Sequence, residues 1–142
     1  MKRKGALLAA IVMSVSATGV SAEKSFTVKS IKKGGYAFSF EGEIIGVGPV
    51  VAAGVMESDG NGNITEAVRT ISINGVPTTQ TFTCSYSINP DGSGSATCPL
   101  DNPGPGFPSV ETFDLALEDK AHSFRFVGTT PGVAVLGSGT RQ

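Results

Sequence analysis

Few side chains in this 142-residue chain could carry out acid–base or nucleophilic chemistry. The chain has one histidine, His122, and two cysteines, Cys84 and Cys98. Nucleophilic catalysis requires a serine or cysteine held beside a base, and the sequence places no such pair around His122. Alternate residues of a strand lie on the same face, so His122 falls on the face of Phe124 and Phe126. We therefore expect it at the inner edge of a strand near a turn, in a structural role.

The two cysteines are predicted to form a disulfide. The turn signal NPDG spans residues 89–92, and Cys84 and Cys98 lie seven positions before and after Asp91. An antiparallel hairpin centred there places them opposite each other, with Cβ atoms about 4.5–5.5 Å apart, close to the separation that a disulfide needs. The alternatives are free buried thiols or a metal pair, but two cysteines without a nearby histidine make a poor zinc site. We predict no metal and no cofactor.

Polar side chains on the predicted apolar faces are the candidates for lining a ligand site. Tyr36 and Tyr86 both fall on aromatic faces. Their hydroxyls could supply the few convergent polar groups of a small-molecule pocket. They could equally belong to core residues whose hydroxyls need a partner. The candidate lining residues are Tyr36, Arg69, Tyr86 and His122.

Alternation places Arg69 on the same strand face as Ile71 and Ile73, which predicts an inward position or one at the rim of the fold. A partly buried arginine requires a carboxylate partner. The sequence does not choose among the available partners, which are Glu41, Glu43 and Glu57. Arg69 could contact a ligand, form an inner salt bridge, or be exposed by a bulge.

Other charged motifs predict structure rather than chemistry. Residues 59–63 (DGNGN) match the start of a calcium loop, but Thr70 stands at the twelfth position, where an EF-hand needs a glutamate. We therefore predict a hairpin turn there. We expect Asp114, Glu118 and Arg125 to face solvent and to pair across strands, an arrangement that contributes little stability.

The first 22 residues have the pattern of a signal peptide. Lys2, Arg3 and Lys4 form a basic start, residues 6–15 are apolar, and residues 20–22 (VSA) offer small side chains for cleavage. The apolar run is shorter than the roughly 20 residues that span a bilayer. The sequence therefore predicts a signal-peptide helix at 1–22, a single domain at 23–142, and a secreted or periplasmic destination.

Signal removal changes the charge balance and the expected partners. The whole chain has 11 Lys and Arg and 12 Asp and Glu; residues 1–22 hold three of the former and none of the latter, which leaves a net charge of −4. Phosphate binding needs a basic face, so a nucleic-acid partner is not expected. The same net charge argues against adhesion to anionic lipid, so no membrane partner is expected after cleavage.

Period-two alternation of apolar and polar residues predicts an all-β domain. A weak ninth segment lies at 25–31. The eight predicted strands are 36–41, 50–58, 63–74, 79–88, 93–98, 110–118, 122–128 and 133–140.

Short turns between successive strands predict an up-and-down order. Eight such strands close into an antiparallel barrel whose interior holds side chains or one small ligand. A two-sheet sandwich needs longer crossings, and only residues 99–109 could provide one. An outer-membrane barrel needs strands of roughly 9–11 residues. The predicted strands are mostly six to nine residues long, at or below that length, and aromatic girdles are missing.

Three segments resemble a group of small secreted bacterial proteins of unknown function: DGNGNIT at 59–65, SINPDGSG at 87–94 and TTPGVAVLGSGTRQ at 129–142. The resemblance extends over residues 34–142. It implies a barrel similar to that of allene oxide cyclases and, more loosely, of calycins such as lipocalins. Allene oxide cyclases fold a reactive substrate inside the barrel, but the resembling segments are turns and strand ends, so no catalytic residue is carried over.

Two functions are consistent with these features. The first is a secreted, non-catalytic barrel that binds a small hydrophobic molecule or is purely structural. The second is a cofactor-free isomerase or cyclase acting on a hydrophobic molecule inside the barrel. The second function needs a cavity of roughly 300 Å³ or more with convergent polar groups, and an interior filled by phenylalanines argues against it. The sequence marks no oligomer interface.

Overall fold

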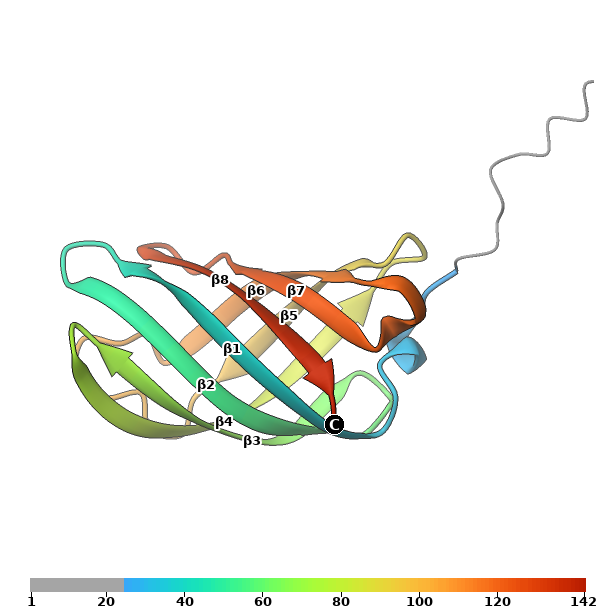
Figure 1. The fold of residues 1–142 in the computed structure, drawn as a ribbon, viewed down its shortest axis with the longest axis horizontal. Coiled ribbons are helices and arrows are strands. Elements are labelled where there is room, and N and C mark those ends of the chain that lie inside the picture. Colours follow the sequence, from blue (N-terminus) through green and yellow to red (C-terminus); the bar gives the residue numbers. More distant parts are fainter. Residues whose placement is uncertain (1–24) are drawn as a thin grey trace, which may run out of the picture.

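Eight antiparallel strands form the domain, as the alternation of side chains predicts. The structure is a computed structural model that describes residues 25–142. Each strand pairs with the next, and β8 returns to β1, which closes the barrel (Figure 1). The predicted fold class is confirmed for the described residues. The strands are β1 (Gly34–Ile44), β2 (Gly48–Ser58), β3 (Asn63–Ile73), β4 (Val76–Ile88), β5 (Ser93–Pro99), β6 (Val110–Leu117), β7 (Ser123–Gly128) and β8 (Val133–Arg141).

The turn between β2 and β3 forms at the predicted DGNG segment. The Asp59 carboxylate accepts hydrogen bonds from the backbone N–H groups of Asn61 (2.7 Å) and Asn63 (3.1 Å). A hydrogen bond from the Asn63 side chain is the main reason that the pKa of Asp59 is lowered. Gly60 has a positive φ of 74°, a conformation that glycine adopts at little cost. The segment therefore acts as a hairpin turn.

A bulge in β3 decides which of its side chains face the interior. The pairing of β3 with β4 shifts between Ile64 and Ala67, which inserts one extra residue into β3. Thr65 and Glu66 are both exposed, and alternation resumes with Ala67 and Arg69 buried. A bulge of this kind reverses the parity of the residues that follow it. Arg69 is thereby turned inward, on the same side as Ile64.

The weak ninth strand predicted at 25–31 is wrong. The segment contains a 3₁₀ helix, η1 (Val28–Ser30), whose Thr27 cap accepts a hydrogen bond from the N–H of Lys29 at 3.2 Å. Because β1 already pairs with β8, the sheet has no free edge for a further strand. The segment instead lies across one end of the barrel, where Ile31 is buried.

The signal peptide predicted at 1–22 lies outside the described residues. A second 3₁₀ helix, η2 (Asp119–Ala121), joins β6 to β7. Neither helix within residues 25–142 is long and apolar enough to cross a membrane.

The disulfide between Cys84 and Cys98 is confirmed. It joins β4 to β5 with a Cα–Cα distance of 4.1 Å, and both cysteines are buried. The regular β4–β5 ladder covers only four residue pairs, from Ser85↔Thr97 to Ile88↔Gly94. The disulfide therefore holds the two strands together next to a short ladder.

Loss of this disulfide is expected to destabilise the barrel. Closing a loop of about 15 residues contributes roughly 3 kcal/mol in the chain-entropy model. We predict that the Cys84→Ser/Cys98→Ser variant has a free energy of unfolding lower by about that amount, measured by urea denaturation. Reductant should lower the stability of the wild type and leave that of the variant unchanged. An equal effect of reductant on both proteins would contradict the prediction.

Candidate functional site in the barrel interior

Aromatic side chains from four strands fill most of the barrel. Their rings meet mainly edge to face: the ring centroids of Phe38 and Phe82 lie 5.9 Å apart, and those of Phe113 and Phe126 lie 5.4 Å apart. Strand β8 makes room for them, because a Cβ atom at Gly139 would lie 2.3 Å from the Phe124 ring. The buried aromatic residues of the strands are Tyr36, Phe38, Phe40, Phe82, Tyr86, Phe113, Phe124 and Phe126.

A cavity of about 70 Å³ remains between these rings. Ile31 and Met56 line it towards the end covered by η1, and Phe40, Phe126 and Arg69 line its inner part. Apolar atoms make up nearly all of its wall. An engineered apolar cavity of about 150 Å³ stays dry and binds benzene or xenon, so this smaller cavity suits a guest of a few heavy atoms.

The two candidate tyrosines hold the N-terminal segment in place. The Tyr36 hydroxyl donates a hydrogen bond to the Lys32 carbonyl at 3.1 Å. The Tyr86 hydroxyl lies 3.4 Å from the Val28 carbonyl and 3.3 Å from the Ser58 hydroxyl. Burial raises the pKa of both phenols. Tyr86 also lines the cavity, but its hydroxyl is engaged by the segment that closes the barrel.

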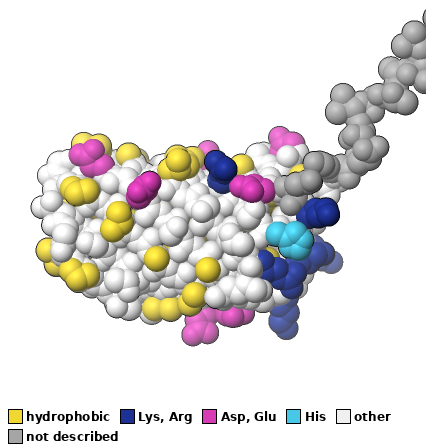
Figure 2. All heavy atoms as spheres, in the orientation of Figure 1, with side chains coloured by type: hydrophobic (Ala, Val, Ile, Leu, Met, Phe, Trp, Pro, Cys, Tyr) yellow, Lys and Arg dark blue, Asp and Glu magenta, His cyan; other side chains and the backbone are white. Residues whose placement is uncertain are grey.

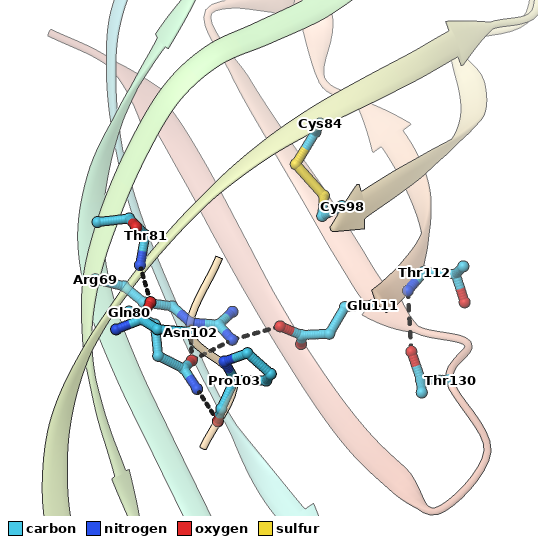
Figure 3. A network of polar contacts seen from close by, with 10 residues as sticks. All are labelled: Arg69, Gln80, Thr81, Cys84, Cys98, Asn102, Pro103, Glu111, Thr112 and Thr130. Carbon is cyan, nitrogen blue, oxygen red and sulfur yellow. Dashed lines mark hydrogen bonds and ion pairs between the residues drawn. A yellow bond between two sulfur atoms is a disulfide. The ribbon is translucent and has the colours of Figure 1, made fainter. Parts of the chain in front are cut away.

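Arg69 is the centre of a buried polar network. Its Nε and Nη2 atoms donate hydrogen bonds to Gln80 Oε1 at 2.9 and 2.7 Å, and Nη2 forms an ion pair with Glu111 Oε1 (Figure 3). Gln80 Nε2 in turn donates to the Pro103 carbonyl at 2.9 Å. Both side chains of the ion pair are at least 98% buried. The network thus ties β3, β4 and β6 to the loop that follows β5.

Three aromatic rings surround the Arg69 guanidinium. Its central carbon lies 5.0 Å from the ring centroid of Phe82, 5.3 Å from that of Phe40 and 5.6 Å from that of Phe107. Cations within about 6 Å of a ring centroid are attracted to the ring face. Phe107 belongs to the loop between β5 and β6, so the arginine also holds this loop over the barrel interior.

The expected carboxylate partners of Arg69 are wrong. Glu41, Glu43 and Glu57 are exposed, and the partner is Glu111 on β6. Glu111 shares parity with Phe113 and Leu115, so its inward position could have been read from the sequence. Gln80, which shares parity with Phe82, was missed in the same way. Parity does not show that β3 and β6, which are not neighbours in the sheet, place these side chains in contact.

Burial raises the pKa of the Glu111 carboxyl, and the adjacent Arg69 charge opposes that rise. Every buried side-chain nitrogen and oxygen among the described residues has a hydrogen-bond partner. The arginine and the carboxylate therefore neutralise each other. Neither is left as an unpaired acid or base facing the cavity.

The inward position expected for His122 is wrong. His122 follows η2, is exposed, and is not part of the cavity wall. Lys120 and Ala121 both have a positive φ, and this turn buries Ala121 instead. Strand β7 begins only at Ser123, so the alternation that places Phe124 and Phe126 inside does not extend back to the histidine.

The exposed positions predicted for three charged residues on and next to β6 and β7 are confirmed. Asp114, Glu118 and Arg125 are exposed. Arg125 Nε lies 3.0 Å from Glu118 Oε1, in an ion pair whose side chains are 73% and 45% exposed. Among residues 25–142, no group of three His, Cys, Asp or Glu side chains is arranged to hold a metal ion.

Comparison with protein-family models, with curated proteins and with solved structures finds no match to this chain.

The buried and the exposed ion pair provide a matched test of the network. Removing one partner of a buried pair leaves a buried charge uncompensated and costs about 3–5 kcal/mol, whereas exposed pairs contribute about 0–1 kcal/mol. We predict that Glu111→Gln lowers the free energy of unfolding by about 3 kcal/mol and that Glu118→Gln lowers it by less than about 1 kcal/mol. Urea denaturation at neutral pH measures both changes.

Replacing both partners is expected to recover stability. Apolar residues of similar volume in place of a buried ion pair are often neutral or stabilising. The Arg69→Met/Glu111→Leu variant should therefore be more stable than the Glu111→Leu variant. A double variant less stable than the single one would show that Arg69 stabilises the barrel without its carboxylate partner.

Proposed function

We propose that the protein is an exported, non-catalytic barrel that binds a small hydrophobic molecule in its interior. The observation that carries this proposal is the apolar cavity of about 70 Å³ lined by the aromatic core. Export is supported by the signal-like pattern of residues 1–22 and by the disulfide, since disulfides persist mainly in oxidising compartments. The up-and-down barrel of eight strands also supports kinship with the allene oxide cyclase-like and calycin-like barrels.

The polar groups of the interior favour binding over catalysis. Arg69 is the charged side chain of the cavity wall, and its described hydrogen bonds go to Gln80 and Glu111. An isomerase or cyclase needs a positioned acid or base at the reacting atoms, and room for its substrate. The cavity is well below the roughly 300 Å³ at which ligand pockets of ordinary size begin. The cyclase alternative therefore has less support.

Xenon, a probe of dry apolar cavities, tests whether the interior accepts a guest. We expect xenon to shift the methyl NMR signals of Ile31, Met56 and Leu115, which line the cavity. The Ala96→Leu substitution adds three carbons to the cavity wall and should abolish these shifts. The control is Ala53→Leu, the same substitution on the outer face of β2, which should preserve them.

Native mass spectrometry of protein purified from its own host tests for a natural guest. A bound mass that the Ala96→Leu variant loses and the Ala53→Leu variant retains would support the proposal. A wild-type protein that carries no guest and whose methyl signals do not respond to xenon would contradict it. That result would favour a purely structural barrel.

A further inference from the structure

The wall of the interior cavity has one part that does not belong to the sheet. Apart from Ile31, every described residue of the wall lies in one of the strands β1 to β7. Each strand is hydrogen-bonded to both of its neighbours in the closed barrel, and the disulfide reinforces the shortest ladder, between β4 and β5. A guest that passed between strands would have to break ladder hydrogen bonds. Ile31 is therefore the part of the wall that can move away while the barrel stays intact.

Ile31 belongs to a segment that we call the η1 strap, residues 25–33. The strap forms no ladder with the described strands. Two of its hydrogen bonds to the barrel are 3.4 Å long, which is near the limit for such a bond. The described hydrogen bonds between strap and barrel run from the Tyr86 hydroxyl to the Val28 carbonyl (3.4 Å), from the Tyr36 hydroxyl to the Lys32 carbonyl (3.1 Å), from Arg141 Nη2 to the Lys33 carbonyl (3.4 Å) and from the Phe26 N–H to the Pro90 carbonyl (3.0 Å).

The side chains of the strap add one fully buried contact. Ile31 is 4% exposed, whereas Phe26 and Val28 are half-buried. The lysines of the strap are exposed, and Figure 2 shows Lys, Arg, Asp and Glu side chains together at this end of the barrel. These charged groups are hydrated whether the strap is closed or displaced. Displacement of the strap therefore exposes mainly the apolar surface of Ile31, Phe26 and Val28.

The opposite end of the cavity is closed more firmly. There Arg69 forms part of the wall, and Phe107 of the loop after β5 covers it from outside. Asn102 fixes that loop through hydrogen bonds to two backbone groups of β4, both at 3.1 Å. A guest entering at this end would have to displace the Arg69 side chain itself, which is bonded to Gln80 and Glu111. The η1 end thus offers the easier route.

We propose that the η1 strap is the gate of the cavity and that Ile31 is its plug. The guest enters and leaves at this end when the strap moves away, while the eight strands keep their pairing. The proposal rests on the proposed function, since a gate requires a guest. Such a gate sets how fast the guest exchanges. It does not set the affinity of the closed state, because a bond that holds the strap closed slows entry and release by the same factor.

A disulfide between the strap and the turn that joins β2 to β3 tests the gate. A Cβ atom at Gly62 would lie 3.7 Å from the Val28 Cβ atom, within the range of about 3.5–4.5 Å that disulfides span. In the Val28→Cys/Gly62→Cys variant we expect xenon entry and release to slow by about tenfold or more, because only openings of the barrel itself remain. Xenon saturation-transfer NMR measures both rates. The fraction of protein with bound xenon, measured from the methyl shifts, should not change.

The matched control is the Val28→Ser/Gly62→Ser variant, which cannot form the cross-link. It has the same backbone strain, because Gly62 has a positive φ of 99°, which a residue with a side chain adopts only at a cost. Neither position belongs to the described cavity wall. The control should exchange xenon at least as fast as the wild type. A cross-linked protein, verified by peptide mapping, that exchanges xenon as fast as this control would overturn the proposal.

Single substitutions at the two ends compare the two routes. Tyr36→Phe removes the hydrogen bond to the Lys32 carbonyl and should speed xenon exchange by about fivefold, the equivalent of one ordinary hydrogen bond. Asn102→Ala loosens the loop at the other end and should leave the rate unchanged. Faster exchange in Asn102→Ala but not in Tyr36→Phe would overturn the proposal and place the entry at the loop after β5.

The gate and the proposed function fail in different measurements. Xenon that binds the wild type but exchanges equally fast in the cross-linked protein and its control overturns the gate alone. A wild type that binds no xenon contradicts the proposed function, and hydrogen exchange then tests whether the strap opens by itself. The N–H of Phe26, bonded to the strap's contact at Pro90, should exchange faster than the N–H of Leu100, bonded to Ser109 at the other end. The reverse order would overturn the gate.

Discussion

The hydrogen-bonded pairing of β1 with β8 is the constraint on which the rest of the molecule depends. It turns an eight-stranded sheet into a closed barrel, so that no strand edge is left to attract another chain. A barrel of eight strands has an interior just wide enough for side chains and one small guest. Closure also leaves no place in the sheet for residues 25–31. That segment therefore lies across the barrel end, where Ile31 covers the cavity and lysines face outward.

A closed interior makes a buried charge costly, and the barrel offsets that cost locally. Arg69 has a carboxylate from Glu111, an amide oxygen from Gln80 and the faces of three phenylalanine rings. Because these partners come from strands on different sides of the barrel and from the loop after β5, the arginine joins parts that the sheet alone does not connect. The same contacts occupy the N–H donors of Arg69, so the wall of the neighbouring cavity is almost entirely apolar.

The two ends of the barrel differ in a way that composition does not reveal. One end has exposed valine and isoleucine in its turns, and the other carries exposed lysines and Arg141 together with acidic side chains of its own turns, among them Asp59 and Asp91.

Contacts close along the chain were the ones that the sequence could predict. Alternation and turn residues indicated eight strands, and the position of Asp91 midway between Cys84 and Cys98 indicated the disulfide. Errors arose where local patterns end: the alternation around Phe124 does not reach His122, because η2 intervenes.

The sequence by itself therefore determined the strands, the hairpins and the face that most side chains occupy, because these follow from neighbours in the chain. Only the tertiary structure decided that Arg69 meets Glu111, that residues 25–31 cover a barrel end, and that Arg141 lies beside Lys33, which is distant from it in sequence. These contacts depend on closure and on the register of strands across the barrel. The alternation of side chains along one strand carries no information about closure or about register across the barrel.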